Sequence, residues 1–148
     1  MNLLFFLTPK AKCAHIFDDD SVREALQRME LSGFTALPIL SRDGAYCGTL
    51  TEGDLLWGLK NECGMDMKAA EQKHIMELPR RRDNLPVRVD TQMQDLLEKA
   101  VNQNFVPVVD DRGSFIGIVT RQSVLRYFQS QSAAAQTAPE SSQKDCIF

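Results

Sequence analysis

The chain has 148 residues, of which 43% are hydrophobic and 25% are charged, and its formal net charge is -3 at pH 7. This length suits one globular unit or two half-size repeats that share a core, and it excludes a large multidomain enzyme. The apolar fraction excludes wholesale disorder, and the mildly acidic total argues against a nucleic-acid polymer as partner, because phosphate binding needs a basic surplus.

The N-terminal residues 1–7 are apolar, but they are too few to cross a membrane and lack the basic start of a signal peptide. Four cysteines lie far apart without the spacing of metal ligands, and the chain has only two histidines. We therefore expect a cytoplasmic protein with free thiols, no metal site and no contact with a membrane.

The first predicted element is an amphipathic helix that follows Ser21. A capping box of Ser21 and Glu24 begins it, and Gly33 is a suitable terminator. Its apolar positions at helical spacing are Val22, Ala25, Leu26 and Met29. A second helix of the same kind is expected behind a second capping box, formed by Thr91 and Gln94.

Each helix is followed by two short strands and another helix. The strands are expected at 37–40 and 45–50 in the first half, and at 106–109 and 114–119 in the second. The closing helices are expected from Thr51 and Thr120. At a shift of 69 residues, identical residues coincide at several positions, among them Pro38/Pro107, Gly44/Gly113, Gly48/Gly117 and Thr51/Thr120. Upstream the shift is 71 residues, so the second copy is two residues shorter just before its proline.

This internal repeat predicts an α/β (α+β) fold of two tandem β-α-β-β-α repeats, packed pseudo-symmetrically. The first repeat covers 8–60 with its N-terminal segment, and the second covers 86–128. Residues 61–85 form a connector, helical over 67–78, in which Pro79–Asp83 reads as an exposed, solvated loop. Residues 129–148 are rich in Ser, Gln and Ala without apolar periodicity, and we expect a disordered tail there.

The repeat resembles a pair of cystathionine-β-synthase (CBS) domains. Its most specific element is the signature Gly-h-x-Thr-x-x-Asp, in which h is apolar. Residues 48–54 (Gly-Thr-Leu-Thr-Glu-Gly-Asp) fit it with a weakly apolar Thr49, and residues 117–123 (Gly-Ile-Val-Thr-Arg-Gln-Ser) end in Ser123 instead of Asp. In such pairs the signature holds the ribose and phosphate of adenine nucleotides in clefts between the repeats. The same residues can also do no more than cap a helix.

A narrower resemblance is to the small stand-alone CBS proteins of Gram-positive bacteria that bind cyclic di-AMP. That family carries Phe-x-x-Pro-x-x-Lys-x-Ala-His, which is intact at 6–15, and Ser-Gly-Tyr-Ser-Ala-Ile-Pro, which has conservative changes at 32–38. Its Thr-Arg-Arg is Thr120-Arg121-Gln122 here. The family regulates proteins such as the (p)ppGpp synthetase and pyruvate carboxylase, and CBS pairs commonly form dimers through their helices.

The resemblance implies two clefts. Cleft A would be formed by Lys12, Ala14, Phe34, Thr35, Ala36, Thr120 and Arg121. Main-chain groups of Ala14 and Ala36 would read the adenine edge, while Lys12 and Arg121 would neutralise phosphates. Cleft B would combine Arg88 and residues 105–107 with Thr51 and Asp54, but Glu52 discourages phosphate there. We expect cleft B to be empty or to hold a neutral adenosine moiety.

The sequence thus predicts a non-enzymatic regulatory protein that senses cyclic di-AMP, with no cofactor. An AMP-, ADP- or ATP-sensing module and a nucleotide-independent dimeric adaptor are the alternatives. Catalysis is disfavoured because the chain contains no nucleophile, P-loop, metalloprotease or dinucleotide-binding motif.

Overall fold

The computed structural model of the chain describes residues 2–136. Its elements confirm the two-repeat α/β fold. The first repeat and the connector contain η1 (Leu3–Phe6), β1 (Thr8–Pro9), η2 (Lys10–Lys12), β2 (Ile16–Phe17), α1 (Val22–Ser32), β3 (Ala36–Leu40), β4 (Tyr46–Thr51), α2 (Glu52–Glu62), α3 (Met67–Gln72) and η3 (Ile75–Glu77). The second repeat contains β5 (Val87–Arg88), α4 (Met93–Asn102), β6 (Phe105–Val109), β7 (Phe115–Thr120) and α5 (Arg121–Gln136).

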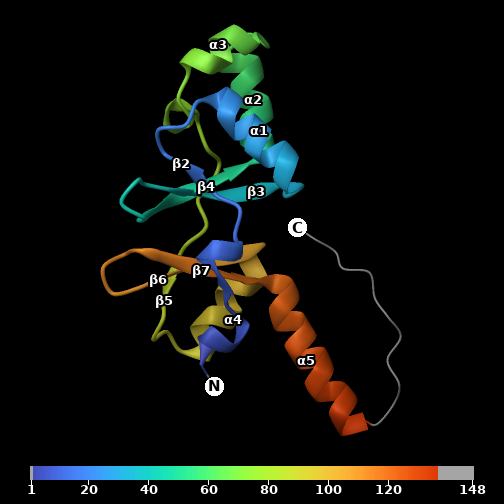
Figure 1. Cartoon of the computed structure of the whole chain (residues 1–148). Coiled ribbons are helices and arrows are strands. Elements are labelled where there is room, and N and C mark those ends of the chain that lie inside the picture. The colour runs from blue at the N-terminus through green and yellow to red at the C-terminus, as the bar shows by residue number, and fades with distance from the viewer. Residues whose placement is uncertain (1, 137–148) are drawn as a thin grey trace.

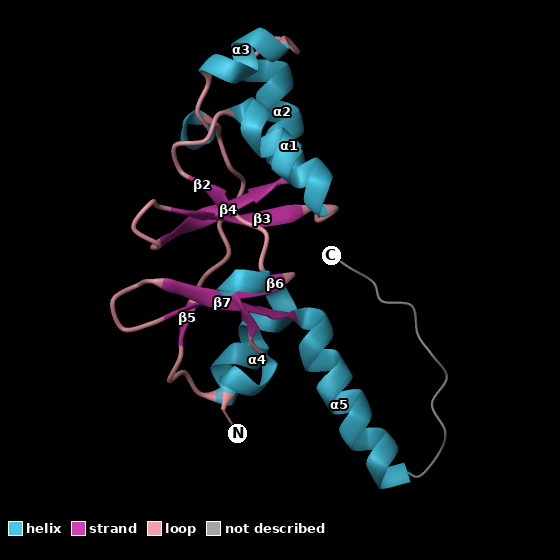
Figure 2. Cartoon of the chain, in the orientation of Figure 1, coloured by secondary structure: helices cyan, strands magenta, loops and turns pink. Residues whose placement is uncertain are grey.

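Two small sheets face each other, and the helices cover their outer faces (Figures 1 and 2). The first sheet has the strand order β2-β3-β4, and the second has the order β1-β7-β6-β5. In the first sheet β2 pairs in parallel with β3, which pairs antiparallel with β4. In the second sheet β5 likewise pairs in parallel with β6, which pairs antiparallel with β7, and β1 adds an antiparallel pairing to the other edge of β7. The sheets are also joined at their hairpin turns, where Phe115 N donates to Gly44 O at 2.8 Å.

Each repeat has its own hydrophobic cluster, so the expected shared core is wrong in that form. Leu37 and Ile39 of β3 pack into the first cluster, and Val106 and Val108 of β6 pack into the second. The alternate residues of the same strands point the other way. They are also buried and lie between the sheets, together with the buried Phe115 of β7. The contact between the repeats is therefore a separate apolar layer, flanked by the two cores.

The first capping box is confirmed and the second is wrong. Ser21 Oγ accepts from Glu24 N at 3.1 Å, and the Glu24 carboxylate accepts from Ser21 N at 2.9 Å. Helix α4 instead begins after Gln92, which makes no side-chain cap, because the Thr91 N–H donates to Arg88 O at 3.0 Å within a preceding turn. Polar residues at capping spacing do not act as caps when a turn already uses the backbone there.

The connector and the tail also depart from expectation. The helix expected over 67–78 ends at Gln72, and a single 3-10 turn follows over Ile75–Glu77. Helix α5 continues to Gln136, so disorder is wrong for residues 129–136. The three alanines there favour helix, and the preceding turns of α5 have already nucleated it. The rest of the predicted tail lies outside the described residues.

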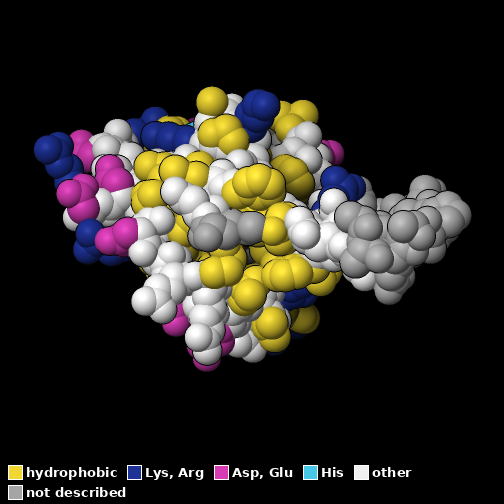
Figure 3. All heavy atoms as spheres, turned by 90° about the horizontal axis from the view of Figure 1, so that it is seen from below, with side chains coloured by type: hydrophobic (Ala, Val, Ile, Leu, Met, Phe, Trp, Pro, Cys, Tyr) yellow, Lys and Arg dark blue, Asp and Glu magenta, His cyan; other side chains and the backbone are white. Residues whose placement is uncertain are grey.

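Figure 3 shows the end of the molecule that carries the N-terminus, where hydrophobic side chains gather over much of the surface. Exposed large hydrophobic residues of η1, α4 and α5 are Leu4, Phe5, Val101, Leu125 and Phe128. Phe5 also packs edge-on against Tyr127, with the ring centroids 5.5 Å apart. Over residues 2–136, no helix is long and apolar enough to cross a membrane.

Candidate ligand-binding cleft

A cavity of about 430 Å³ lies between the two repeats. Its first wall comes from the N-terminal segment and the start of β3, and its second wall from β7 and the first turns of α5. The lining residues are Thr8, Lys12, Cys13, Ala14, Phe34, Ala36, Leu37, Pro38, Phe105, Ile118, Thr120, Gln122, Ser123 and Arg126. Pockets of a few hundred cubic ångströms suit small organic ligands. The structure therefore forms a cavity where the sequence places cleft A.

Most of the residues predicted for cleft A line this cavity. Lys12, Ala14, Phe34, Ala36 and Thr120 lie on its walls. Because the first four belong to the first repeat and Thr120 belongs to the second, a ligand here would contact both.

Two residues predicted for cleft A have other contacts. The carbonyl of Thr35 accepts from Glu52 N at 2.9 Å and so helps to hold the start of α2. The Arg121 guanidinium donates from Nε to Ala100 O at 3.0 Å and from Nη2 to Val101 O at 3.4 Å. Neither residue lines the cavity. Arg121 instead stabilises the C-terminal end of α4, where cations interact favourably with unpaired carbonyls.

The cation that α5 contributes to the cavity is Arg126, which sequence reasoning missed. Arg126 follows Gln122 by four residues and Ser123 by three, so the three side chains share one face of α5. All three line the cavity. The helical spacing of Arg126 from Gln122 and Ser123, which follow the signature threonine, was the signal that could have identified it.

The electrostatic character of the cavity is cationic. Lys12 and Arg126 line it, and none of its described lining residues is acidic. Burial raises the pKa of the Cys13 thiol to about 11, so this side chain remains neutral near pH 7. Its Sγ donates to Pro9 O at 3.3 Å, within the N-terminal segment. The cavity thus combines two positive side chains with mainly apolar walls, a combination that suits an organic anion.

The signature of the second repeat caps helix α5. Thr120 Oγ1 accepts from Ser123 N at 3.0 Å, and Ser123 Oγ donates to Thr120 O at 2.8 Å. In the first repeat the corresponding pair is Thr51 and Asp54, which form a full capping box on α2. Thus both signatures act as helix caps, and only the first has a carboxylate.

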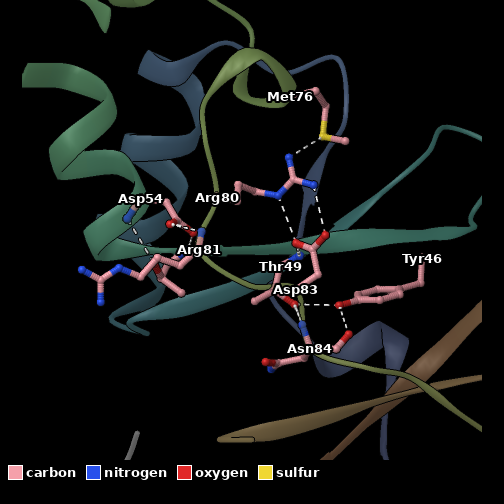
Figure 4. Close-up of polar contacts among 9 residues, drawn as sticks. Tyr46, Thr49, Asp54, Met76, Arg80, Arg81, Asp83 and Asn84 are labelled. Carbon is pink, nitrogen blue, oxygen red and sulfur yellow. Dashed lines mark hydrogen bonds and ion pairs between the residues drawn. The ribbon is translucent and has the colours of Figure 1, made fainter. Parts of the chain in front are cut away.

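The first-repeat signature, predicted to belong to cleft B, lies against the chain's own connector (Figure 4). Asp54 is almost fully buried, and both carboxylate oxygens are used: Oδ2 accepts from Thr51 N at 3.0 Å and Oδ1 from Arg81 N at 3.2 Å. The Asp83 carboxylate accepts from Thr49 N at 2.9 Å and forms two hydrogen bonds with Arg80, at 3.0 and 3.1 Å. The expectation of an exposed, solvated loop over Pro79–Asp83 is therefore wrong for Arg80 and Asp83, which fold back onto β4, whereas Pro79, Arg81 and Arg82 are exposed.

The connector is further held by Tyr46 and Asn84 (Figure 4). The Tyr46 hydroxyl donates to Asn84 O at 2.7 Å and shares a 2.6 Å hydrogen bond with the Thr49 hydroxyl. Burial raises the pKa of Tyr46, so its hydroxyl keeps its proton near neutral pH. Asn84 Nδ2 donates to Phe105 O at 3.0 Å. These contacts tie the connector to both repeats.

Other residues predicted for cleft B lie elsewhere or face both clefts. Arg88 is exposed and lies 3.7 Å from the Asp90 carboxylate. Phe105 lines the cavity of cleft A, although its carbonyl accepts from the connector. Within the described part of the chain, no group of three or more His, Cys, Asp or Glu side chains could hold a metal ion.

Two βαββα repeats face to face, with a ligand-sized cavity between them, define the chain as a paired-repeat binding module. The family model of the CBS domain matches residues 8–61 and 75–130. The chain therefore belongs to the CBS domain family, and the resemblance drawn from the two signatures is confirmed.

Solved structures with the same fold include two nucleotide complexes. CbpB from Listeria monocytogenes, in complex with c-di-AMP, is 20% identical with a TM-score of 0.79, over 89% of this chain and 98% of that one. Another CbpB complex with c-di-AMP is 20% identical with a TM-score of 0.82, over 93% and 90%. At 20% identity these similarities show the fold alone.

A closer sequence match is CBSX2, a CBS-pair protein from Arabidopsis thaliana. Its complex with AMP is 27% identical, with a TM-score of 0.68, over 88% of this chain and 98% of that one. The inosine-5'-monophosphate dehydrogenase of Methanocaldococcus jannaschii is 26% identical over 118 residues. The match spans 78% of this chain but only 22% of the dehydrogenase, about a fifth of its length.

Proposed function

We propose that the chain is a non-enzymatic regulatory protein that binds an adenine nucleotide in cleft A. The observation that carries this proposal is the cavity between the repeats, with Lys12 and Arg126 on its walls and no acidic residue among its described lining. Apolar residues such as Phe34 and Pro38 offer surface to a base, and the two cations offer charge to phosphates. The nucleotide complexes of CbpB and CBSX2 support this ligand class.

Cyclic di-AMP is the favoured ligand because of what replaces the signature carboxylate. Ser123 stands where the first repeat has Asp54, so cleft A offers no carboxylate to a pair of ribose hydroxyls. In cyclic di-AMP one of these hydroxyls is esterified to phosphate, and the ring carries two negative charges. Two cations without a carboxylate therefore suit the cyclic dinucleotide better than AMP.

Regulation of another protein follows from the way the cavity is built. A ligand in cleft A would contact β3 of the first repeat and α5 of the second, and could favour one arrangement of the repeats over another. A ligand shifts such an equilibrium only through different affinities for the two states. We propose that the ligand state controls a partner protein in the cytoplasm. The resemblance to cyclic-di-AMP-binding CBS proteins favours a (p)ppGpp synthetase or pyruvate carboxylase.

We also propose that two chains form a homodimer through their helices. Leu56 on α2 and Leu125 on α5 hold the same place in the two repeats and are 51% and 62% exposed. Leu56 borders an apolar groove between α1 and α2, which Leu26, Met29, Leu55 and Leu59 also line. A two-fold dimer would bury the same surface on both chains.

Light scattering should give a dimer for the wild type and a monomer for Leu56→Glu with Leu125→Glu. Leu85→Glu is the control, because the Leu85 side chain is also exposed but lies on the connector.

Equilibrium titration of the purified full chain with cyclic di-AMP, AMP, ADP and ATP tests the proposed function. We expect micromolar or tighter binding of cyclic di-AMP and at least about tenfold weaker binding of AMP, as the missing carboxylate requires. Tighter binding of AMP would favour the alternative sensor, for which the similarity to CBSX2 speaks. No binding of any of the four, with an intact dimer, would favour the adaptor.

A further inference from the structure

We infer that the chain fills cleft B with its own connector, so that only cleft A takes a nucleotide. The inference rests on the proposed function and adds the number and place of the ligands. It starts from the repeat, because residues 79–85 precede β5 as residues 8–14 precede β2. Residues of the segment 8–14 line cleft A, whereas residues of the segment 79–85 lie against β4 and α2.

The connector occupies the carboxylate that would bind a ribose. A carboxylate that accepts ribose hydroxyls needs lone pairs that face the cleft. The Asp54 oxygen that is not used in the helix cap accepts from Arg81 N at 3.2 Å, and Asp54 is 5% exposed. The backbone N–H of Arg81 thus takes the place of a ribose hydroxyl. A nucleotide would first have to displace the connector backbone.

The connector also occupies the carbonyl that would read adenine. Phe105 begins β6 as Ala36 begins β3, so its carbonyl corresponds to the main-chain group expected to read the base in cleft A. It accepts from Asn84 Nδ2 at 3.0 Å and from Gln103 Nε2 at 3.3 Å. A carbonyl oxygen has two lone pairs, and both are used here. The Asn84 amide group imitates the exocyclic amino group of an adenine.

The two clefts also differ in the charge of one corresponding side chain. Where cleft A has Lys12, the connector has Asp83, which lies against β4. Burial opposes ionisation of this carboxyl, but hydrogen bonds from Arg80 and from Thr49 N outweigh it and lower its pKa below 3.8. Asp83 is therefore anionic at neutral pH and is paired with Arg80 inside the chain. A phosphate entering cleft B would be repelled by the Asp83 carboxylate, and the guanidinium of Arg80 is already paired with that carboxylate.

Counting the nucleotides bound per chain tests the inference. In calorimetric titrations of the full chain with cyclic di-AMP and with AMP, we expect one site per chain. Lys12→Ala should weaken it at least about tenfold, whereas Asp54→Asn, which keeps the helix cap, should change it less than about twofold. A second site, or a single site that is lost in Asp54→Asn and kept in Lys12→Ala, would overturn the inference and still show that the chain binds nucleotides.

Hydrogen exchange tests the closed cleft without any ligand. The amides of Thr49 and Arg81 donate to carboxylates, so both should be protected in the wild type. Asp83→Ala should speed exchange at Thr49 by at least about tenfold, while Asp111→Ala, on the exposed β6–β7 turn, should not. Rapid exchange of both amides in the wild type would overturn the inference. Protection of both amides together with no nucleotide binding would refute the proposed function and leave the filled cleft standing.

Discussion

Lys12 and Asp83 hold the same position in the two repeats, four residues before β2 and β5, and they carry opposite charges. Lys12 lines cleft A, and the Asp83 carboxylate accepts from the N–H of Thr49 on β4. Strand β1 covers the corresponding edge of β7, where Thr8 pairs with Ile118. One sheet therefore has four strands and the other three, because a side chain replaces a strand. This difference leaves a cavity in cleft A and places the connector in cleft B.

Removing the cations of cleft A should weaken ligand binding. We expect Lys12→Ala and Arg126→Ala each to lower the affinity for cyclic di-AMP at least about tenfold, because each loses a charge-assisted contact. Arg121→Ala should leave the affinity within about twofold and lower stability by about 1 kcal/mol, because its guanidinium holds carbonyls of α4. Calorimetry and urea unfolding measure both effects, with Arg112→Ala as the control. An affinity loss in Arg121→Ala equal to that in Arg126→Ala would contradict the assignment.

Restoring the signature carboxylate in cleft A should change ligand preference. Ser123→Asp recreates in α5 the capping pair that Thr51 and Asp54 form in α2. The new carboxylate can accept ribose hydroxyls of AMP and repels the two phosphates of cyclic di-AMP. The ratio of the two affinities should move toward AMP by about tenfold or more. Ser123→Asn, which keeps the shape without the charge, is the control, and an unchanged ratio in the aspartate variant would oppose this role for Ser123.

Packing at Gly117 should control the N-terminal wall of cleft A. A Cβ at this position would collide with the backbone carbonyl of Thr8, so Gly117→Ala should push β1 away from β7. We expect a loss of about 1–3 kcal/mol in stability, together with weaker nucleotide binding. Gly53→Ala on α2 is the matched control, since its nearest contact would be an ordinary 3.7 Å. Wild-type stability and affinity in Gly117→Ala would show that β1 is not needed there.

The connector contact should weaken in acid. The pKa of Asp83 in the folded chain lies below its ordinary value of 3.8, so its contribution to stability is present above that pH and is lost as the pH falls through the folded pKa. The stability difference between the wild type and Asp83→Asn should therefore be largest near neutral pH and shrink as the pH falls below 3.8. Urea unfolding across this range measures it, with Asp111→Asn as the control. A constant difference would mean that the charge of Asp83 does not matter.

The sequence was sufficient to predict the fold and one wall of the site. The paired signatures at Thr51 and Thr120 set the repeat, and β3, β4, β6 and β7 begin and end within one residue of the four strands expected. The N-terminal motif at residues 6–15 identified Lys12 and Ala14 as cleft residues, because its match to the family motif assigns each residue a position in the cleft. Five of the seven residues expected in cleft A line its cavity.

The misses have physical causes that a linear sequence does not reveal. Arg121 and Arg126 both lie on α5, and only their rotation around the helix axis decides which one faces the cavity. The charged run Arg80–Arg82 is typical of a solvated loop. The sequence does not show that the next residue, Asp83, accepts from the N–H of Thr49, which is 34 residues away in the chain. Edge strands require such partners, but their identity depends on tertiary packing.

Two-dimensional NMR of the full chain shows directly which cleft binds cyclic di-AMP, because it maps the amides that respond when the ligand is added. Saturating ligand should shift the signals of Ala14, Ala36 and Thr120, which line cleft A, and leave those of Thr51 and Arg81 in place. Shifts confined to Thr51 and Arg81, with the signals of cleft A unchanged, would contradict binding in cleft A and show that the ligand enters cleft B.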